Sequence, residues 1–305
     1  MLEFFSIRFY FNFTEKFSFM KTLLLSVGMF FLSHCQTQTP QKLETITELP
    51  HQIKEASACE ISKASDLIWT IEDQGNKNIL FGFDKKGTLQ KKIKITNVKN
   101  HDWEDLTSDD EGNIYIGDFG NNDNERKNLA IYKINAEDLA KDEAQASEII
   151  QFYYPEQTEF PPKKKNRIFD VESFFFYQNQ FYLFTKNRSS KSDGTTNLYR
   201  VENNPNKKIP AQKLSSFVTC DNFNHCAVTS AAISPDKKKV AILTSDKVWI
   251  FRDFKNDDFF SGKSEKIELN HFTQKEGLCF ENDHSILITD EASKKGNSFL
   301  YRLNL

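Results

Sequence analysis

Apolar and polar positions recur along this chain as a unit that begins with an acidic or hydroxyl residue. The unit continues with two or three apolar positions, a polar turn, and a second β-rich run that ends in an acidic or polar residue. Four copies have the same internal spacing of 14 positions. They pair Glu104 with Asp118, Glu172 with Lys186, Ser230 with Thr244, and Glu276 with Asp290. An earlier copy begins at Ser57, and the five starts lie 47, 68, 58 and 46 residues apart, which indicates a repeat architecture with variable loops.

Each repeat predicts up to four short strands, because runs of β-branched and aromatic residues alternate with turn residues. The first four repeats place these strands at 57–61, 67–71, 79–83, 90–95, 104–107, 113–116, 130–134, 148–154, 172–176, 181–185, 197–201, 212–217, 230–234, 240–244, 248–251 and 266–269. The fifth repeat gives only 276–280, 286–289 and 299–303. A lone alternating strand at 43–49 belongs to no repeat, and a short helix is predicted at 136–146.

The lone strand and the incomplete fifth repeat complement each other. Joining them gives an all-β domain over residues 43–305, a five-bladed β-propeller closed by its N-terminal strand. Closure of this kind removes the exposed strand edge that would otherwise invite aggregation. The alternative is six blades, with a degenerate blade in the stretch 135–170. That stretch contains only one clear strand, so we favour five blades.

The N-terminal residues have the pattern of a targeting segment. Residues 20–34 begin with Met20-Lys21 and continue with an apolar run, which is typical of a secretory signal and shorter than the roughly 20 residues that span a bilayer. The sequence Leu-Ser-His-Cys that ends at Cys35 resembles a bacterial lipobox. We therefore expect lipidation of Cys35, a lipidated tether at 35–42, and a location in the bacterial cell envelope. The alternative is an ordinary cleaved signal followed by a free cysteine.

Residues 1–19 precede this signal, and we interpret them as an upstream extension with the true start at Met20. The remaining cysteines are consistent with an oxidising compartment, because they are even in number. Cys220 and Cys226 flank a short loop and are predicted to form a disulfide. Cys59 and Cys279 either pair or act as small buried apolar residues, and the second interpretation is favoured.

The overall charge excludes one class of partner. The chain has 305 residues and a formal net charge of −3, so no long-range field favours nucleic acid. We expect a monomer that contacts the membrane only through its lipid.

In a propeller the first strand of each blade lines the central channel, so the five repeat starts should point toward one axis. Three carboxylates meeting there would repel each other, and a buried charge needs a partner or a metal. Ca²⁺ accepts about six to eight oxygen ligands in flexible geometry, whereas Mg²⁺ demands a tight octahedron. The predicted Ca²⁺ ligands are Ser57, Glu104, Glu172, Ser230 and Glu276. The alternative is that backbone N–H groups satisfy each acid separately.

The ends of the second strands form a wider ring around the same end of the channel, which we call the mouth. Its members are Asp73, Asp118, Lys186, Asp246 and Asp290. Cations beside a bound Ca²⁺ suit a small phosphorylated or otherwise anionic ligand, so Lys186 and Arg188 are predicted to bind the ligand. Asp290 of the same ring is the third predicted ligand-binding residue. Asp73 or Asp118 is the candidate base that would activate water.

The ordered set of Trp103-Glu104, Glu172-Ser173, Thr229-Ser230 and 276–280 resembles the calcium-activated nucleotidase (apyrase) family. The chain is less closely similar to phytase-like and SdiA-regulated-type propellers. The first resemblance implies a five-bladed propeller with a central calcium that hydrolyses nucleoside di- and triphosphates. Two functions remain open, because a propeller fold does not determine activity. One is a calcium-dependent hydrolase, and the other is a non-catalytic propeller that binds a ligand or protein around a structural calcium.

Overall fold

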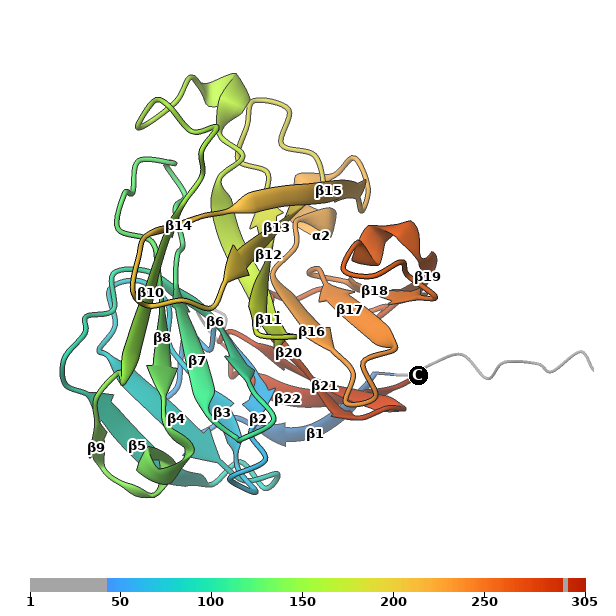
Figure 1. Cartoon of the computed structure of the whole chain (residues 1–305). Helices are drawn as coiled ribbons and strands as arrows, with labels where there is room; N and C mark the ends of the chain where they lie inside the picture. Colours follow the sequence, from blue (N-terminus) through green and yellow to red (C-terminus); the bar gives the residue numbers. More distant parts are fainter. Residues whose placement is uncertain (1–42, 293–295) are drawn as a thin grey trace, which may run out of the picture. The chain divides into compact units, whose positions relative to one another are not determined.

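Five β-sheets surround one centre in the part of the chain that the structure describes (Figure 1). The computed structural model describes residues 43–292 and 296–305, so the predicted extension, signal, tether and Cys35 lie outside the described residues. The predicted five-bladed β-propeller is confirmed, and no sixth sheet is present in these two ranges.

Four strands form the body of each blade, in antiparallel order from the centre outward. Blade one contains β2 (Glu60–Ile61), β3 (Ile68–Thr70), β4 (Ile79–Phe83) and β5 (Leu89–Ile95). Blade two contains β6 (Trp103–Ser108), β7 (Ile114–Asp118), β8 (Ala130–Ile134) and β10 (Glu148–Tyr153). Blade three contains β11 (Asp170–Tyr177), β12 (Gln180–Lys186), β13 (Thr195–Glu202) and β15 (Gln212–Val218). Blade four contains β16 (Ser230–Ile233), β17 (Lys239–Leu243), β18 (Lys247–Arg252) and β19 (Lys263–Glu268).

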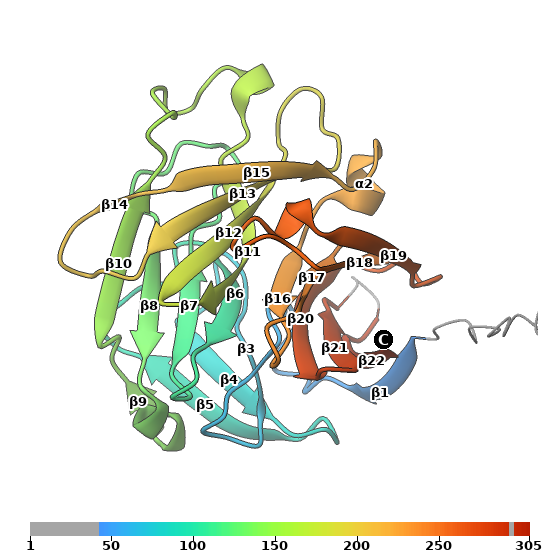
Figure 2. The ribbon, with the colours of Figure 1, turned by 45° about the vertical axis from the view of Figure 1, so that its right-hand side comes forward.

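Blade five is built from both ends of the described chain. Its strands are β20 (Lys275–Asn282), β21 (Ser285–Asp290), β22 (Phe299–Asn304) and β1 (Glu44–Glu48). β1 pairs antiparallel with β22, with Thr45 opposite Tyr301, and Figure 2 shows the two strands side by side. The predicted closure by the N-terminal strand is therefore confirmed.

The hydrophobic core is divided into five clusters, one at each junction between neighbouring blades. Trp69 of blade one packs with Trp103 of blade two in the first cluster. Phe174 of blade three lies edge-on against Phe119 of blade two, with ring centroids 5.0 Å apart. Each sheet buries both faces in this way. This burial explains why the middle strands of the sheets, such as β7 and β21, are nearly continuous apolar runs.

Two very short strands connect neighbouring blades along their outer edges. β9 (Glu143–Ala144), which follows β8 in the chain, pairs parallel with β5 of blade one. β14 (Ile209–Pro210), which precedes β15, pairs parallel with β10 of blade two. The stretch predicted as an alternative sixth blade thus supplies strands to blades one and two. The helix predicted at 136–146 is only the 3-10 turn η1 (Ala136–Ala140), because the chain then enters β9.

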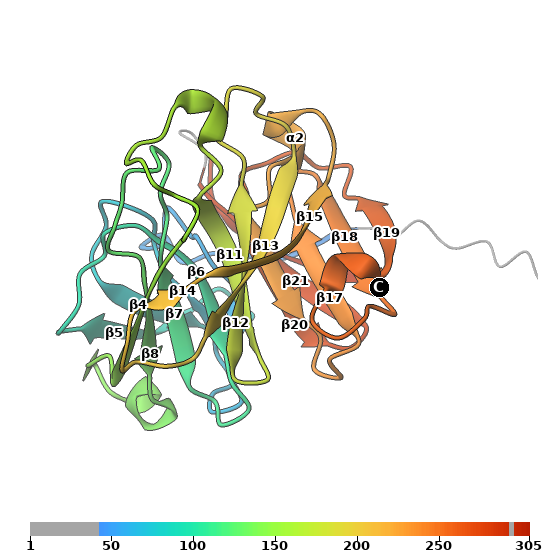
Figure 3. The same ribbon diagram turned by 45° about the horizontal axis from the view of Figure 1, so that its top comes forward.

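Long loops rise from one end of the sheets, where they carry η2 (Lys164–Asn166) and the short helix α2 (Phe223–Cys226) (Figure 3). A further 3-10 turn, η3 (Phe259–Ser261), lies between β18 and β19. Within residues 43–292 and 296–305, no helix has the length and apolar character that crossing a membrane requires.

Candidate functional site

The pairing of the strands explains why acidic residues gather at one end of the channel. In each blade the start of the inner strand lies opposite the end of the second strand. Trp103 lies opposite Asp118, Asp170 opposite Lys186, and Lys275 opposite Asp290. The start of each inner strand therefore shares the mouth with the end of its neighbour, as the repeat pattern predicts.

Three carboxylates from blades one and two form an acidic group at this mouth that could hold a metal ion. One oxygen each from Asp73, Asp102 and Glu104 lies within 4.8 Å of the other two. Asp102 and Glu104 are only 2% and 5% exposed, and Asp73 is partly exposed. Of these, Glu104 was predicted as a metal ligand and Asp73 as a base. Asp102 was not predicted, although it stands two residues before Glu104 at the repeat start.

Gly120 provides the space that this acidic group occupies. A Cβ atom at this position would lie 2.0 Å from Oε1 of Glu104 and 2.6 Å from Oδ2 of Asp102. The Gly120 N–H also donates to the backbone carbonyl of Asp102, at 3.2 Å. Any side chain at this position would therefore displace the two carboxylates.

The three carboxylates hold protons more tightly than ordinary acids. Burial, followed by repulsion from Asp73, raises the pKa of Asp102 to about 8. Burial and the neighbouring acids, Glu172 first, raise the pKa of Glu104 well above its usual value. Burial also raises the pKa of Asp73. The protein alone thus does not balance the negative charge that these three carboxylates would carry when ionised.

The residues fit a hard divalent cation. Oδ1 of Asp102 is buried and has no hydrogen-bond partner among the described residues. Two oxygens on opposite sides of a Ca²⁺ ion lie about 5 Å apart, which matches the spacing of the three carboxylates. The donors are all oxygens, which favour Ca²⁺ or Mg²⁺ over softer transition metals.

Glu172 lies at the same mouth but has a different environment. Nζ of Lys186 lies 3.1 Å from one of its oxygens, and Nη2 of Arg188 lies 2.7 Å from the other. Burial opposes ionisation, yet these two cations hold the pKa of Glu172 below its usual value. Nε of Arg188 also donates to Asp170 at 2.6 Å. Lys186 and Arg188, predicted as ligand-binding residues, therefore pair with buried acids of blade three.

Glu276 completes the set of three glutamates at the repeat starts. It is partly exposed, and burial raises its pKa to about 8 although Lys186 lies nearby. Glu291 follows β21 on the same side, and burial together with Asp73 raises its pKa to about 7. Both acids thus keep their protons to a higher pH than ordinary carboxylates.

The two serines predicted as metal ligands have hydrogen bonds within the protein. Oγ of Ser57 donates to the backbone carbonyl of Glu104 at 2.7 Å. Oγ of Ser230 donates to the buried Asp105 at 3.3 Å and accepts from the N–H of Leu278 at 3.0 Å. These bonds join blade one to blade two, and blade four to blades two and five. The serines need no metal to account for their burial.

Asp118, predicted as a base, is enclosed by four hydrogen-bond donors. These are the Tyr132 hydroxyl at 2.6 Å, Arg126 Nη2 at 2.7 Å, His101 Nδ1 at 2.9 Å and the Asp102 N–H at 3.1 Å. The carboxylate is fully buried, and no free oxygen lone pair faces the mouth. We therefore remove Asp118 from the candidate bases, and Asp73 is the candidate that the geometry leaves.

Asp290 occupies the equivalent position in blade five and has equivalent partners. It accepts from the Tyr301 hydroxyl at 2.7 Å and from the Phe299 N–H at 2.6 Å. An aspartate at the end of the second strand thus binds a tyrosine of the third strand in two blades. This pattern indicates that Asp290 stabilises the blade, in contrast to the predicted role in ligand binding.

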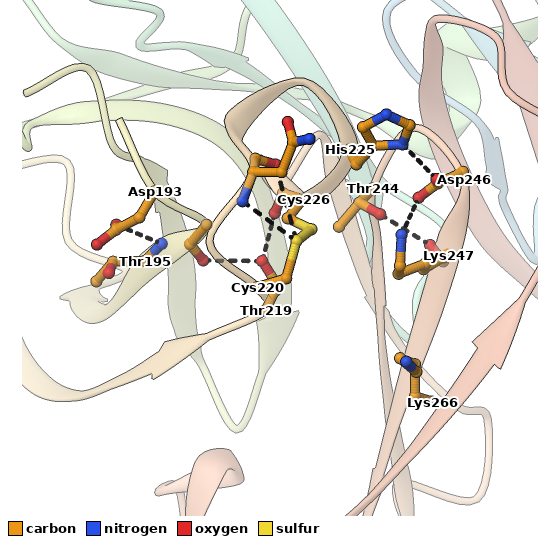
Figure 4. The surroundings of a disulfide bond; sticks show 12 residues. Asp193, Thr195, Thr219, Cys220, His225, Cys226, Thr244, Asp246, Lys247 and Lys266 are labelled. Carbon is orange, nitrogen blue, oxygen red and sulfur yellow. Dashed lines mark hydrogen bonds and ion pairs between the residues drawn. A yellow bond between two sulfur atoms is a disulfide. The ribbon is translucent and has the colours of Figure 1, made fainter. Parts of the chain in front are cut away.

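The predicted disulfide between Cys220 and Cys226 is present in the loop that connects blade three to blade four. Cys220 and Cys226 are bonded, with Cα atoms 5.6 Å apart (Figure 4). The same figure shows His225 of this loop directed at Asp246, 2.6 Å from Nδ1 to the carboxylate. Asp246 is the member of the outer ring in blade four. The bonded loop thus holds a histidine at the rim of the mouth.

The fold and the mouth define a class, that of five-bladed β-propellers with an acidic entrance to the channel. No protein-family model matches the sequence, and no curated protein matches it. The PQQ-bound aldose sugar dehydrogenase from Streptomyces coelicolor is similar in structure, with a TM-score of 0.49 and 8% identity over 86% of this chain and 98% of that one. A gluconolactonase from Xanthomonas campestris gives a TM-score of 0.45 and 11% identity over 87% and 89%. A chain of the nidogen/laminin complex gives a TM-score of 0.45 and 8% sequence identity over 78% of this chain and 72% of that one.

Identities this low describe a similarity of fold and say nothing about activity. The comparisons do not support membership of the calcium-activated nucleotidase family that the repeat starts resemble. The function must therefore be argued from the mouth itself.

Proposed function

We propose that this chain is a calcium-binding β-propeller whose mouth holds Ca²⁺ and, through the ion, a small phosphorylated or otherwise anionic ligand. The observation that carries the proposal is the cluster of Asp73, Asp102 and Glu104, with its unpaired buried oxygen. Ionised together without a cation, these carboxylates would repel each other in a poorly solvated site.

The ion is also what would attract an anionic ligand. Lys186 and Arg188 are already paired with Glu172 and Asp170, so they offer little free positive charge. Three protein carboxylates leave several of the six to eight coordination positions of Ca²⁺ open. Phosphate or carboxylate oxygens of a ligand would fill these positions, with the two cations at the edge of the site.

Hydrolysis is the second candidate function, and one observation favours it. Asp73 is partly exposed beside the proposed ion, and its raised pKa makes it a better proton acceptor than an ordinary carboxylate. Ca²⁺ held by this group would supply electrostatic polarisation of a bound phosphoryl group. Asp73 would accept the proton of a water that attacks the phosphorus atom, while the leaving group departs with its oxygen. The resemblance to calcium-activated nucleotidases suggested this reaction class.

Calorimetric titration of chelator-treated protein with Ca²⁺ tests the ion site. We expect binding to one site, a weaker response to Mg²⁺, and at least a tenfold loss of affinity for Asp102→Asn. Asp110→Asn is the matched control, because Asp110 is an exposed acid paired with Lys63 far from the mouth. Equal affinity in both variants would contradict the proposed site.

The ligand is tested next, with thermal shifts over a panel of phosphate esters and carboxylates in the presence and absence of Ca²⁺. Stabilisation that requires Ca²⁺ supports the binding function. Phosphate release from the same panel, lost in Asp73→Asn at Ca²⁺ concentrations that saturate the variant, supports hydrolysis. Binding without release assigns the non-catalytic function.

We also propose that the protein is a monomer held at the bacterial cell envelope by a lipid on Cys35. The support is the signal-like run and the cysteine that follows it, both of which belong to the sequence outside the described residues. Mass spectrometry of protein from native membranes should find an acylated N-terminus at Cys35. A mature N-terminus without lipid at another residue would contradict this location.

A further inference from the structure

Two cysteines that lie 220 residues apart in the sequence meet at the junction of blades one and five. Cys59 directly precedes β2, and Cys279 lies in β20. Their Sγ atoms are 3.3 Å apart, and both thiols are buried, with exposures of 0% and 2%. They belong to the hydrophobic cluster that joins these two blades.

The backbones around this pair are held unusually close together. A Cβ atom at Gly277 would lie 2.4 Å from the carbonyl carbon of Ala58 and 2.6 Å from the backbone nitrogen of Cys59. The Thr289 hydroxyl donates to the carbonyl of Ala58 at 3.2 Å, which fixes the same segment against blade five. The approach of the two sulfur atoms is thus imposed by the main chain on both sides.

We propose that Cys59 and Cys279 form a disulfide that covalently joins blade one to blade five. A bonded pair of sulfur atoms lies about 2.05 Å apart, so the two sulfur atoms must approach each other from the observed 3.3 Å to form the bond. The structure contains both residues as free, buried cysteines, as the sequence analysis favoured. The proposal goes beyond this, because it takes the 3.3 Å contact as a pair that is poised for oxidation.

The chemistry needs an oxidant of a common kind. The two thiols together lose two protons and two electrons as the S–S bond forms. A protein or small-molecule disulfide accepts the two electrons and two protons and becomes two thiols. The chain that acquires the disulfide between Cys220 and Cys226 meets such an oxidant, because that bond forms by the same exchange.

Burial determines when the bond forms. In the closed ring, the hydrogen bond to Cys59 and burial raise the pKa of Cys279 well above its usual value, so little thiolate is available for exchange. The exchange therefore takes place during folding, before the last junction closes. After closure the bond is shielded from reductants by the same packing.

Peptide mapping of the full chain tests the bond. The protein is exported into an oxidising compartment, purified without reductant, denatured with N-ethylmaleimide present, and digested. We expect the peptides of Cys59 and Cys279 to be linked and unalkylated until a reductant is added. Two alkylated cysteines beside an intact Cys220–Cys226 bond, or either cysteine linked to another partner, would overturn the proposal.

A stability measurement provides a second, independent test. In Cys220→Ser/Cys226→Ser only the other pair can respond to a reductant. Because the closed ring shields that bond, the variant is unfolded, reduced and refolded with the reductant present. We expect its midpoint of thermal unfolding to lie below that of the untreated variant. Cys59→Ser/Cys279→Ser, which retains the Cys220–Cys226 disulfide, is the control in which the linked peptide should be absent. An unchanged midpoint in the first variant contradicts a bond between the blades.

Discussion

Asp102 is the residue on which the acidic mouth depends most, since it is nearly inaccessible and one of its oxygens has no partner among the described residues. Replacing it with asparagine removes a buried acid that the metal-free protein must either keep protonated or leave charged beside two other acids. We expect chelator-treated Asp102→Asn to be more stable than the unaltered protein, on the order of 1 kcal/mol. With Ca²⁺ in excess the order should reverse, because the variant loses a ligand. Unfolding curves with and without Ca²⁺ measure both effects, and the same order under both conditions would contradict the site.

Gly120 allows a test that leaves every charge unchanged. In Gly120→Ala the new methyl group would meet the carboxylates of Glu104 and Asp102, so we expect weaker Ca²⁺ binding together with lower stability. The control is Gly262→Ala, whose Cβ would lie 2.4 Å from the backbone oxygen of Arg252, outside the mouth. That variant should lose stability with unchanged Ca²⁺ affinity by calorimetric titration. A loss of affinity in both variants would indicate a general effect of destabilisation.

The acidity of the mouth has a consequence for pH. Burial raises the pKa of Asp102 and of Glu276 to about 8 in the folded state, whereas the ordinary pKa values of 3.8 and 4.5 apply in the unfolded chain. The unfolded state therefore gains the charge first, and the stability of metal-free protein should fall as pH rises from about 4 to about 8. The decrease is at most about 1.4 kcal/mol per pH unit for each group. Thermal unfolding across this range should show the slope, and saturating Ca²⁺ should flatten it.

The repeat pattern predicted part of this residue-level picture. It located Glu104, Glu172 and Glu276, because the same position in each repeat reaches the same axis. It did not identify Asp102, which lies outside the aligned positions and enters the group through the turn before β6. It also gave Asp118 a catalytic role, since the donors that surround its carboxylate come from other strands and loops whose positions depend on the fold.

At the level of elements, a hydrogen bond from a tyrosine of the third strand to an aspartate of the second strand stabilises blades two and five. The pairs are Tyr132 with Asp118 and Tyr301 with Asp290. We expect Tyr132→Phe to cost about 1.5–3 kcal/mol, because a buried carboxylate loses a donor. The control Tyr153→Phe removes the hydroxyl of a tyrosine that is 41% exposed, and should change stability by less than about 0.5 kcal/mol. Urea unfolding of both variants measures the difference. Equal costs would show that the Asp118 contact contributes little.

The main strands were predictable because each sheet is covered on both faces and so has a strong apolar pattern. β9 and β14 were not predictable, since two residues cannot show a periodicity and their pairing joins distant parts of the chain. The first strand of blade one was predicted at 57–61 and is limited to β2 at Glu60–Ile61. Just before β2 the chain bonds to neighbouring blades, as in the contact of Ser57 with blade two.

At the level of the whole molecule, the strand β1 decides whether the ring is complete. A chain that begins at residue 50 lacks β1 and leaves the edge of β22 open to pairing with other molecules. We expect it to aggregate or form oligomers, whereas a chain that begins at residue 43 should remain monomeric. Size-exclusion chromatography with light scattering distinguishes the two results. Monomers from both chains would show that β1 is dispensable for closure.

The fold as a whole was predictable from the number of strands, because three strands at one end and one strand at the other make a complete blade. The metal, the ligand and the activity were not predictable to the same degree. They depend on which side chains neutralise each other across blades, as Lys186 and Arg188 do with Glu172.

The short strands β9 and β14 fasten blade two to blade one and blade three to blade two, but the described residues contain no such link on the outer edges of blades four and five. The outer edges of blades one, two and three are therefore joined by backbone pairing, whereas those of blades four and five are not joined in this way among the described residues. Heat or pulling should separate blades four and five first, so that amide protons of β17 and β18 exchange with solvent before those of β7 and β8. A propeller with equal blades would unfold with no preferred starting point, whereas local unfolding of this one should begin at blade four.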